Sequence, residues 1–325
     1  MSADGGPAGS MLRVAVLDDY QGVALELADW GPVRERGTVD SFRDRFTDRS
    51  ELVRALAPYD VVVLMRERTP MPATVLEALP RLRLLVTTGR RNAAVDVEAA
   101  RTRGIVVSGT ESSATAPVEL TWALALGLAR QLVTEDRNLR DGGWQTTVGK
   151  GLSGRTLGVL GLGRIGSRVA AVGRAFGMEV LGWSPHLTPE RAAEAGARAV
   201  PLDELLATSD VVTVHLVLGE STRGLLGAAE LAAMKPDALL VNTSRGPIVD
   251  QAALLAALDR GHLGGVGLDV YDEEPLPVDH RLRSAPRTLL TPHLGYVTED
   301  LYRTFFTQVV EDIVAFLDGA PVRQL

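Results

Sequence analysis

Short runs of apolar residues alternate along the chain with stretches in which apolar residues recur at helical spacing. Runs of this kind, rich in Val and Ile, are typical of parallel strands covered by helices. In the first part of the chain they fall at Leu12–Leu17, Val61–Leu64, Leu84–Thr87 and Ile105–Val107, with helical patterns between them at Ser50–Ala57 and Ala73–Leu79. The alternation predicts βαβ units and therefore an α/β fold.

A second series of strand-like runs begins near Thr156. It comprises Thr156–Leu160, Glu179–Trp183, Val211–Leu216, Ala238–Asn242, Val266–Val270 and Thr288–Leu290. Two long helical patterns flank this series, one over 116–130 and one over 299–317, and Asp318-Gly319 is a stop signal for the second. The second helix either packs back onto the first domain, making that domain discontinuous, or ends a simple two-domain chain. The spacing alone favours neither arrangement.

Composition narrows the classes of function. The 325 residues suffice for about two domains. The net charge is −7 and no block of Lys or Arg offers a footprint for nucleic acid, and no apolar run approaches the ~18 residues of a membrane span. The chain has no cysteine, which excludes disulfides, Cys-ligated metals and a Cys nucleophile, and fits a reducing compartment. Residues 1–10 are small and polar, so we expect a flexible tail rather than a signal peptide.

A glycine-rich turn directly follows the strand predicted at Thr156–Leu160. The run Gly161-Leu162-Gly163-Arg164-Ile165-Gly166 matches G-x-G-x-x-G, and a helical pattern and then another strand follow it. This context is what the dinucleotide-binding fingerprint requires. Gly161 permits the tight turn, Gly163 lets backbone approach a pyrophosphate, and Gly166 lets helix and strand pack closely. The helix N-terminus, with Arg164 and Ile165 at its entry, would face the phosphates.

The end of the next strand bears on the choice between NAD and NADP. An acid there usually holds the adenosine ribose, but the sequence reads Trp183-Ser184-Pro185-His186. A neutral Ser184 does not repel a 2′-phosphate, and His186 or Arg164 is placed to reach one. The sequence therefore favours neither cofactor.

Hydride transfer to a carbonyl also needs a proton donor, most often a histidine. We expect His262 to be solvated after a helix, His280 to lie in a polar loop, and His186 to lie near the adenosine. His215, late in a strand, is placed to line the cofactor cleft. His293 stands just past Thr288–Leu290, where ligands of a parallel sheet bind, although a structural histidine fits that position nearly as well.

Two further strand ends carry charges that suit this chemistry. Arg245 lies in Asn242-Thr243-Ser244-Arg245-Gly246, and its planar fork suits a carboxylate with a neighbouring carbonyl. Glu274 follows the strand ending at Val270 and is suited to pair with a histidine and favour its protonated form. Each charge alone is typical of a surface salt bridge, but their occurrence at consecutive strand ends favours an active site.

Together these motifs resemble the D-isomer-specific 2-hydroxyacid dehydrogenase family, over about residues 12–317. The glycine turn, Asn242–Gly246, Leu268-Asp269-Val270 with Glu274-Pro275, and Thr291-Pro292-His293-Leu294-Gly295 occur in the family's order and approximate spacing. The resemblance implies two doubly wound parallel-sheet α/β domains. A Rossmann NAD(P)-binding domain, residues 114–297, would be inserted into a discontinuous flavodoxin-like substrate domain, residues 11–113 and 298–325.

The same resemblance implies a role for each site residue. Arg245 would bind substrate, Glu274 would orient His293, and His293 would donate or accept the proton. Asp269 would hold the nicotinamide amide, with Thr243 and His215 also beside the cofactor. The resemblance further implies a cytoplasmic, metal-independent homodimer, joined by an arm over 130–144 that carries Leu132, Val133, Leu139 and Trp144.

Three positions depart from the family's pattern. Ser184 replaces the usual acid, and Val217 stands where a proline is common. The substrate loop, whose backbone N–H groups usually bind the substrate carboxylate, reads Thr88-Gly89-Arg90-Arg91-Asn92, with Arg91 in place of the second glycine. Arg90 and Arg91 either recognise an extra anion or point to solvent. Glu274 argues against the formate dehydrogenase branch, which carries glutamine there.

The sequence therefore predicts an oxidoreductase that interconverts a 2-oxo acid and a D-2-hydroxy acid with NAD or NADP. Its catalytic residues would be Arg245, Glu274 and His293, and its partner would be a small-molecule acid rather than nucleic acid or a membrane. An alternative of another class is a cofactor-binding sensor or corepressor on the same fold. A third is an enzyme narrowed to phosphorylated substrates through Arg90 or Arg91.

Overall fold

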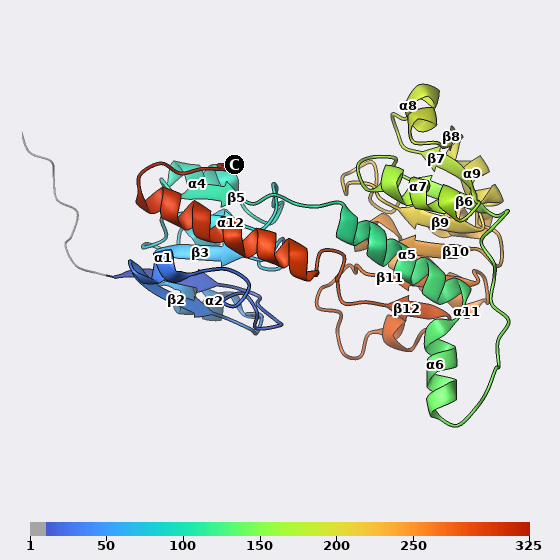
Figure 1. Cartoon of the computed structure of the whole chain (residues 1–325), viewed down its shortest axis with the longest axis horizontal. Coiled ribbons are helices and arrows are strands. Elements are labelled where there is room, and N and C mark those ends of the chain that lie inside the picture. The colour runs from blue at the N-terminus through green and yellow to red at the C-terminus, as the bar shows by residue number, and fades with distance from the viewer. Residues whose placement is uncertain (1–10) are drawn as a thin grey trace, which may run out of the picture. The chain divides into compact units, whose positions relative to one another are not determined.

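The computed structural model describes residues 11–325, which form two compact units (Figure 1). The first unit contains the described residues up to Ser113 together with Thr298–Leu325, and the second contains Ala114–Val297. The expectation about residues 1–10 lies outside the described range. The assignment of the two units to substrate and cofactor stays a prediction.

The first unit is built on a five-stranded parallel sheet in the order β2-β1-β3-β4-β5. Its strands are β1 (Leu12–Val16), β2 (Gly37–Ser41), β3 (Val61–Leu64), β4 (Leu84–Thr87) and β5 (Val106–Gly109). Its helices are α1 (Gly31–Arg34), α2 (Arg49–Leu56), α3 (Ala73–Leu76), α4 (Val97–Thr102) and α12 (Glu299–Leu317). The strand order is that of flavodoxin-like folds.

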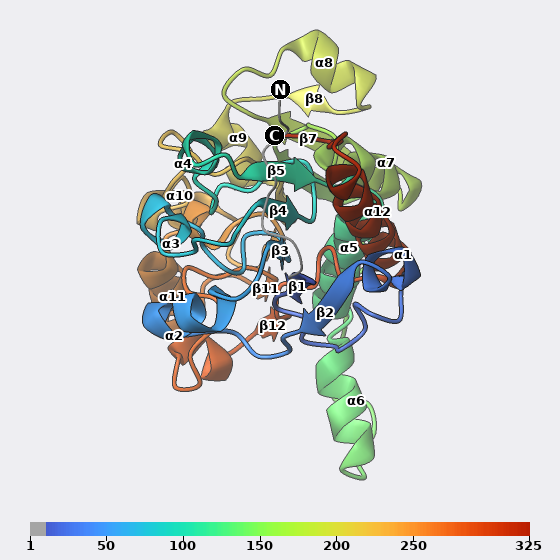
Figure 2. The same ribbon diagram turned by 90° about the vertical axis from the view of Figure 1, so that its left-hand side faces the viewer.

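Helices cover both faces of this sheet. Helices α2, α3 and α4 pack on one face, and α1 and α12 lie together on the other (Figure 2). In α12, buried Phe305, Phe306, Val309 and Ile313 face the sheet. Beyond α12 the chain reaches β5, where the Leu325 amide donates to the Val107 carbonyl at 2.9 Å. The last residues of the sequence thus complete the unit that the first described residues begin.

The second unit is built on a seven-stranded parallel sheet in the order β12-β11-β10-β9-β6-β7-β8. Its strands are β6 (Thr156–Leu160), β7 (Glu179–Trp183), β8 (Arg198–Ala199), β9 (Val211–Val214), β10 (Leu239–Asn242), β11 (Gly265–Leu268) and β12 (Thr288–Leu290). The order turns back between β6 and β9, which is the switch point of a Rossmann sheet. With both sheets parallel throughout, the predicted fold class is confirmed.

Two layers of helix sandwich the second sheet. Its helices are α5 (Thr115–Ala129), α6 (Leu132–Arg140), α7 (Gly166–Ala175), α8 (Pro189–Glu194), α9 (Leu202–Thr208), α10 (Ala228–Ala233) and α11 (Gln251–Asp259), with short 3₁₀ turns η1 (Gly246–Ile248) and η2 (Arg281–Ser284). Helices α5 and α7 share one apolar core, and α9, α10 and α11 share the other. None of the helices within residues 11–325 has the length and apolar character to cross a membrane.

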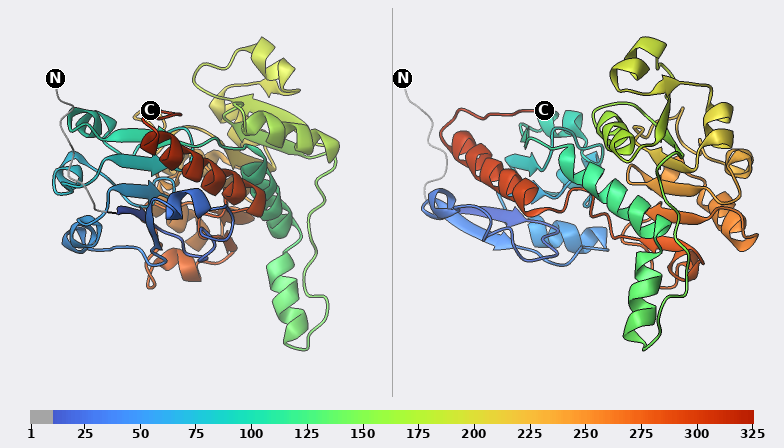
Figure 3. Two further views of the ribbon diagram at one scale, coloured as in Figure 1. Left: turned by 60° about the vertical axis from the view of Figure 1, so that its left-hand side comes forward. Right: turned by 45° about the vertical axis from the view of Figure 1, so that its right-hand side comes forward.

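Helix α6 stands away from the sheet of its own unit, and the chain returns beside it (Figure 3). Its Glu135 carboxylate accepts from the amides of Thr146 and Thr147, which ties the returning segment to the helix. Large apolar side chains on α6 and the return are exposed, among them Leu132, Leu139 and Trp144. This is the segment predicted to form an intersubunit arm.

Two strands escaped the sequence analysis. Strand β2 reads Gly-Thr-Val-Asp-Ser and is mostly half-buried at the sheet edge, so it lacks an apolar run. Strand β8 has only two residues. Strand β9 is shorter than expected and ends at Val214, so His215 lies just past the strand and not within it.

Candidate functional site

Arg245 is carried on a turn that Asn242 organises. Asn242, the last residue of β10, is buried, and its side-chain oxygen accepts from the Ser244 amide at 3.0 Å. Its side-chain nitrogen donates to the Arg245 carbonyl at 2.9 Å. The Thr243 hydroxyl meets the Thr121 hydroxyl of α5 at 2.9 Å. Hydrogen bonds therefore fix the backbone that presents the half-buried Arg245 guanidinium.

The loop after β11 lies directly against this turn. A Cβ atom at Gly246 would collide with the backbone of Tyr271 and Asp272, so only glycine permits the approach. Further along the same loop, the Tyr271 amide donates to Glu274 Oε1 at 2.9 Å. The carboxylate of Glu274 is thereby held by the residue that the Arg245 turn contacts.

His293 completes the group from the loop after β12. Its Nδ1 lies 2.5 Å from Glu274 Oε2, and its ring packs edge-on against Tyr296 with centroids 5.3 Å apart. Because Nδ1 faces the carboxylate, Nε2 is the ring nitrogen left to exchange a proton with a ligand. The structure thus brings two of the three predicted catalytic residues into direct contact and packs the turn of the third, Arg245, against the loop that carries Glu274.

The backbone of His293 is in the left-handed region, with φ of +54°. This conformation is strained for a residue with a Cβ atom and persists where its surroundings enforce it. Asp269, fully buried just past β11, does so: its Oδ1 accepts from the Thr291 hydroxyl and the Leu294 amide, each at 2.6 Å. Its Oδ2 accepts from the Gly295 amide at 2.8 Å. The same carboxylate predicted beside the nicotinamide therefore also anchors the His293 loop.

The charges around Glu274 favour its ionised form. Burial by itself raises the pKa of Glu274, but the hydrogen bond and charge of His293, the Tyr271 amide and the charge of Arg245 outweigh it, so the net pKa is lowered. Burial raises the pKa of Asp269, and the Thr291 hydrogen bond and the two amides offset part of that rise. Glu274 is the carboxylate suited to stabilise an imidazolium.

The glycine turn at 161–166 fits a dinucleotide. Gly161 has φ of +98°, and a Cβ there would collide with the backbone of His215. A Cβ at Gly166 would collide with the Gly161 carbonyl. A Cβ at Gly163 would meet no described atom within 4 Å, which leaves open space over the turn. No described side chain caps the first turn of α7. The amides of Ser167 and Arg168 donate to the carbonyls of Gly163 and Ile165 at 2.9 and 3.0 Å, so the turn itself supplies their partners in this structure.

The residues predicted around the adenosine lie at the end of β7. Ser184 is half-buried at the first position past the strand, and His186 and Arg164 are exposed. No carboxylate occupies the position of Ser184, so the charge that usually disfavours a 2′-phosphate is missing there.

His215 differs from the other histidines in its surroundings. Its amide donates to the Leu160 carbonyl at 2.7 Å, which places it beside the glycine turn. Its Nε2 is buried without a hydrogen-bond partner among the described residues. Burial lowers the pKa of His215 to about 3, so the ring is neutral at working pH and unsuited to deliver a proton. By contrast, His262 is half-buried and bonded to the Leu231 carbonyl, rather than solvated as expected.

Comparisons with known proteins show the family to which the chain belongs. The sequence profile of the D-isomer specific 2-hydroxyacid dehydrogenase NAD binding domain matches residues 122–295. The chain belongs to this dehydrogenase family. The resemblance inferred from the motifs is therefore confirmed, and the matched part of the chain is an NAD-binding type of domain.

Two related proteins and one solved structure show what the chain is similar to. Glyoxylate reductase from Aeropyrum pernix is 40% identical over 255 residues, or 75% of this chain and 76% of that protein. D-3-phosphoglycerate dehydrogenase from Archaeoglobus fulgidus is 37% identical over 278 residues, or 85% of this chain but 53% of that protein. The chain thus spans about half the length of that relative. The crystal structure of phosphoglycerate oxidoreductase from Vibrio cholerae superposes with a TM-score of 0.89 at 38% identity, covering 95% of this chain and 100% of that one.

In the first unit of this dehydrogenase-family chain, the loop after β4 holds the residues predicted to bind substrate. Gly89 has φ of +95°, and a Cβ there would collide with the guanidinium of Arg66. Arg90 is exposed and pairs with exposed Glu111 at 3.5 Å, and Arg91 is exposed. Arg66, at φ of +53° just past β3, donates to the Thr88 carbonyl and is half-buried. Arg66, from the loop after β3, is therefore a half-buried cation held against the predicted substrate loop, and the sequence analysis did not single it out.

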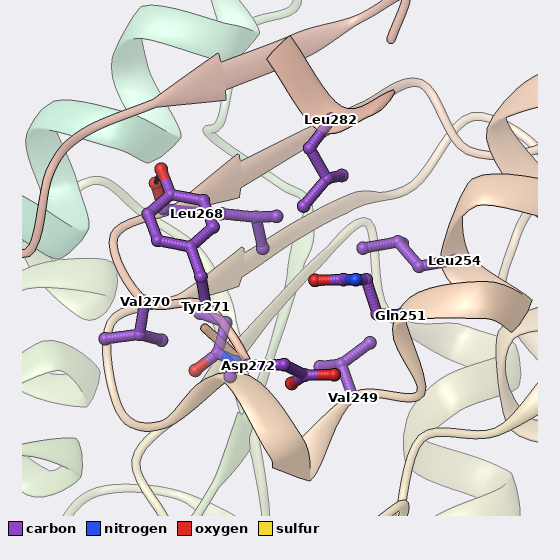
Figure 4. Close-up of a pocket in the computed structure, with 10 residues that line it drawn as sticks. Val249, Gln251, Leu254, Leu268, Val270, Tyr271, Asp272 and Leu282 are labelled. Carbon is purple, nitrogen blue, oxygen red and sulfur yellow. Dashed lines mark hydrogen bonds between the residues drawn. The ribbon is translucent and has the colours of Figure 1, made fainter. Parts of the chain in front are cut away.

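A small pocket lies between the loops after β10 and β11 (Figure 4). Asn242, Gly246, Tyr271 and Asp272 line it from those loops, and Leu282 and Gln251 line it from the opposite side. The Asn242 side chain binds the backbone carbonyl of Arg245, and the backbone amide of Tyr271 binds the Glu274 carboxylate. The sequence analysis assigned no function to Asn242 or Tyr271. Within residues 11–325 no three His, Asp or Glu side chains group as a metal site would require.

Proposed function

We propose that this protein is an NAD(P)-dependent oxidoreductase that interconverts a 2-oxo acid and a D-2-hydroxy acid. The observation that carries the proposal is the 2.5 Å contact between Glu274 Oε2 and His293 Nδ1, with the Arg245 turn packed on the loop that carries Glu274. A charged guanidinium and a carboxylate-backed imidazole at the carboxyl end of one parallel sheet suit a substrate with a carboxylate next to a reacting oxygen.

Each residue would act through an atom that its surroundings fix. Arg245 binds the substrate carboxylate and the neighbouring carbonyl oxygen and polarises the carbonyl. His293 Nε2 donates a proton to that oxygen in reduction, and the neutral ring takes the proton back in oxidation. Glu274 stabilises the imidazolium and holds the ring by Nδ1. A bound nicotinamide supplies the hydride to C2 in reduction and accepts it in oxidation.

The cofactor would lie along the edge that starts at the glycine turn. Gly161, Gly163 and Gly166, with the backbone at Arg164 and Ile165, would hold the pyrophosphate at the start of α7. Ser184 would face the adenosine ribose and tolerate either NAD or NADP. Thr243, His215 and Asp269 would line the nicotinamide end.

The first unit would contribute the substrate loop. The Gly89 amide itself donates to the Thr110 hydroxyl at 2.8 Å, so the backbone amides that follow Gly89 would bind the substrate carboxylate. Arg66 supports that loop from the Thr88 carbonyl. Which 2-oxo acid fits depends on side chains that differ among family members, so the substrate is proposed here only as a class. We assign Arg90 and Arg91 to solvent because both are exposed.

The exposed apolar residues of the α6 arm support a homodimer. An isologous interface would bury Leu132, Val133, Leu139 and Trp144, which solvent now reaches. A chain without cysteine also fits a reducing compartment, and we propose that the protein works in the cytoplasm. Light scattering should give about twice the one-chain mass at micromolar concentration, and a monomer there would refute the dimer.

A substrate panel tests the proposed reaction. The purified protein is mixed with small 2-oxo acids, dicarboxylic 2-oxo acids and phosphorylated 2-oxo acids, each with NADH and with NADPH, and the reduced cofactor is followed by absorbance. We expect turnover of at least one acid and no turnover of matched aldehydes, which lack the carboxylate that Arg245 binds. Turnover of aldehydes alone, or of no acid with either cofactor, would contradict the proposal.

A further inference from the structure

Tyr271 contacts all three loops that carry the candidate catalytic residues. It belongs to the Glu274 loop, and its amide donates to Glu274 Oε1 at 2.9 Å. Its backbone is the surface on which Gly246 of the Arg245 turn rests. Its hydroxyl lies 2.9 Å from the carbonyl of Thr291, in the His293 loop. Tyr271 therefore links the three loops directly.

The Thr291 carbonyl is the point from which the strained turn to His293 starts. It accepts the His293 amide at 3.0 Å and also the Tyr271 hydroxyl. The hydroxyl proton is shared with the more distant Leu268 carbonyl, at 3.2 Å. Tyr271 therefore links the end of β11 to the turn that places the imidazole at φ of +54°.

The hydroxyl remains a donor under working conditions. Burial, followed by the charges of Asp269 and Glu274, raises the pKa of Tyr271, while Arg283 lowers it in part. Part of the Tyr271 side chain borders the pocket beside Leu268 and Leu282 (Figure 4). Tyr271 is otherwise buried in the same apolar core as these two leucines, and the hydrogen bonds to the two carbonyls fix where its hydroxyl end lies.

We propose that Tyr271 is a positioning residue that sets the spacing between Glu274 and His293, holding the carboxylate by its amide and the His293 loop by its hydroxyl. The proposal rests on the function proposed above, because it assumes that this pair moves the proton. Asp269 holds the opposite side of the same loop, through the Leu294 and Gly295 amides. Tyr271 thus acts through the pair and does not itself touch the substrate.

Tyr271→Phe removes the hydroxyl but keeps the ring and the amide that holds Glu274. We expect reductive kcat to fall about threefold to tenfold, the usual effect of losing one buried hydrogen bond, with a smaller change in KM for the 2-oxo acid. The pH at which the reductive rate falls should move lower, because a looser contact with Glu274 stabilises the protonated pair less. The charged groups facing the pair are Asp269, which acts on His293, and Arg245, which acts on Glu274, and this variant leaves both in place.

Tyr59→Phe is the matched control. Tyr59 is buried in the first unit, and its hydroxyl donates to Asp40 Oδ2 at 2.7 Å, so the substitution removes a comparable bond away from the catalytic loops. It should leave the pH profile unchanged. An equal shift in both variants, or a Tyr271→Phe profile and kcat that match the wild type, would overturn the proposal.

Combining Tyr271→Phe with Glu274→Gln tests the route of the effect. If Tyr271 acts through the spacing of the pair, its effect on the pH profile should vanish once the carboxylate charge is gone. A shift of the same size in both backgrounds would show that Tyr271 acts elsewhere. NMR titration of the His293 ring signals, without substrate or cofactor, repeats the single-variant comparison if no 2-oxo acid is turned over. That result separates failure of the positioning role from failure of the proposed reaction.

Discussion

Two loops at strand ends, one in each unit, enter the left-handed region by different means. The loop after β4 does so at Gly89, with φ of +95°, and the loop after β12 does so at His293, with φ of +54°. Glycine adopts this conformation freely, whereas a residue with a Cβ atom pays roughly 1–3 kcal/mol. The second unit therefore keeps a strained backbone at His293 where glycine would be easier, and Asp269 and Tyr271 form hydrogen bonds to the residues of the loop on either side of His293.

The side chains of the two loops also differ in how far they are exposed to solvent. The His293 side chain is 21% exposed and contacts Glu274, whereas the Arg90 side chain is 68% exposed and pairs with a carboxylate that is itself 60% exposed. An ion pair that is exposed to solvent contributes little to the stability of the folded protein. We interpret the His293 loop as one that positions a side chain for a ligand. We interpret the Gly89 loop as one that positions backbone groups.

The largest expected effect comes from removing the side chain that the His293 loop places. His293→Gln should lower turnover by about 10²–10⁴-fold, the usual contribution of a general acid. Binding of the reduced cofactor, followed by fluorescence titration, should survive because the glycine turn lies elsewhere in the unit. Near-normal turnover would mean that another residue supplies the proton and would remove the functional contrast between the two loops.

Arg245→Lys tests the third loop of the same site. Lysine keeps the charge but loses the planar fork, so both KM and kcat should suffer, with kcat/KM falling about tenfold to a hundredfold. The kcat effect is expected because the contact strengthens as charge develops on the carbonyl oxygen. Steady-state kinetics with the best acid of the panel measures both constants. Wild-type values would place Arg245 outside the site.

Ser184→Asp sharpens the cofactor side of the second unit. A carboxylate at the end of β7 should repel a 2′-phosphate and accept ribose hydroxyls, so the preference should move toward NADH. We expect the ratio of kcat/KM for NADH to that for NADPH to rise about tenfold, which corresponds to ~1.4 kcal/mol. An unchanged ratio would show that Ser184 does not face the ribose.

The smallest effect is expected in the Gly89 loop. Arg90→Ala and Arg91→Ala should each change kcat/KM for a small 2-oxo acid by less than about twofold. Charges as exposed as these contribute little free energy of interaction. Phosphorylated 2-oxo acids provide the matched comparison. A loss confined to the phosphorylated acids would assign these arginines to anion recognition and would contradict their assignment to solvent.

Much of the fold could be predicted because buried parallel strands are written as apolar runs. The strands at Thr156–Leu160, Glu179–Trp183 and Thr288–Leu290 were predicted with the bounds that the structure has. The half-buried edge strand β2 was missed, since its polar and apolar residues carry no such run. The helix at Glu299–Leu317 was predicted, but the spacing alone left its return to the first unit open, because that depends on which surface its apolar face covers. Only the family resemblance implied the return.

The sequence could predict the residues of the candidate site whose own side chains carry the charge or the proton. It could not predict the residues that position them. Arg245, Glu274 and His293 stand out as charges at strand ends, and the structure joins Glu274 to His293. Asn242 and Tyr271 were missed because what they hold is backbone, through contacts that no residue pattern records. The left-handed conformation of His293 is likewise imposed by Asp269 from another strand end.

The pH dependence of reduction in wild type and in Glu274→Gln tests the central claim most directly. The pKa of Glu274 is lowered, so its carboxylate stays charged while the pair takes up and releases the catalytic proton. Reduction needs the protonated ring. Reductive kcat/KM should therefore be high at low pH and fall as pH rises through the apparent pKa of the pair, and oxidative kcat/KM should rise over the same range. Glutamine keeps the shape but removes the charge that stabilises the imidazolium, so both limbs should move to lower pH while cofactor binding stays nearly unchanged. Superimposable profiles for the two proteins would contradict the coupling of Glu274 to His293 on which this account rests.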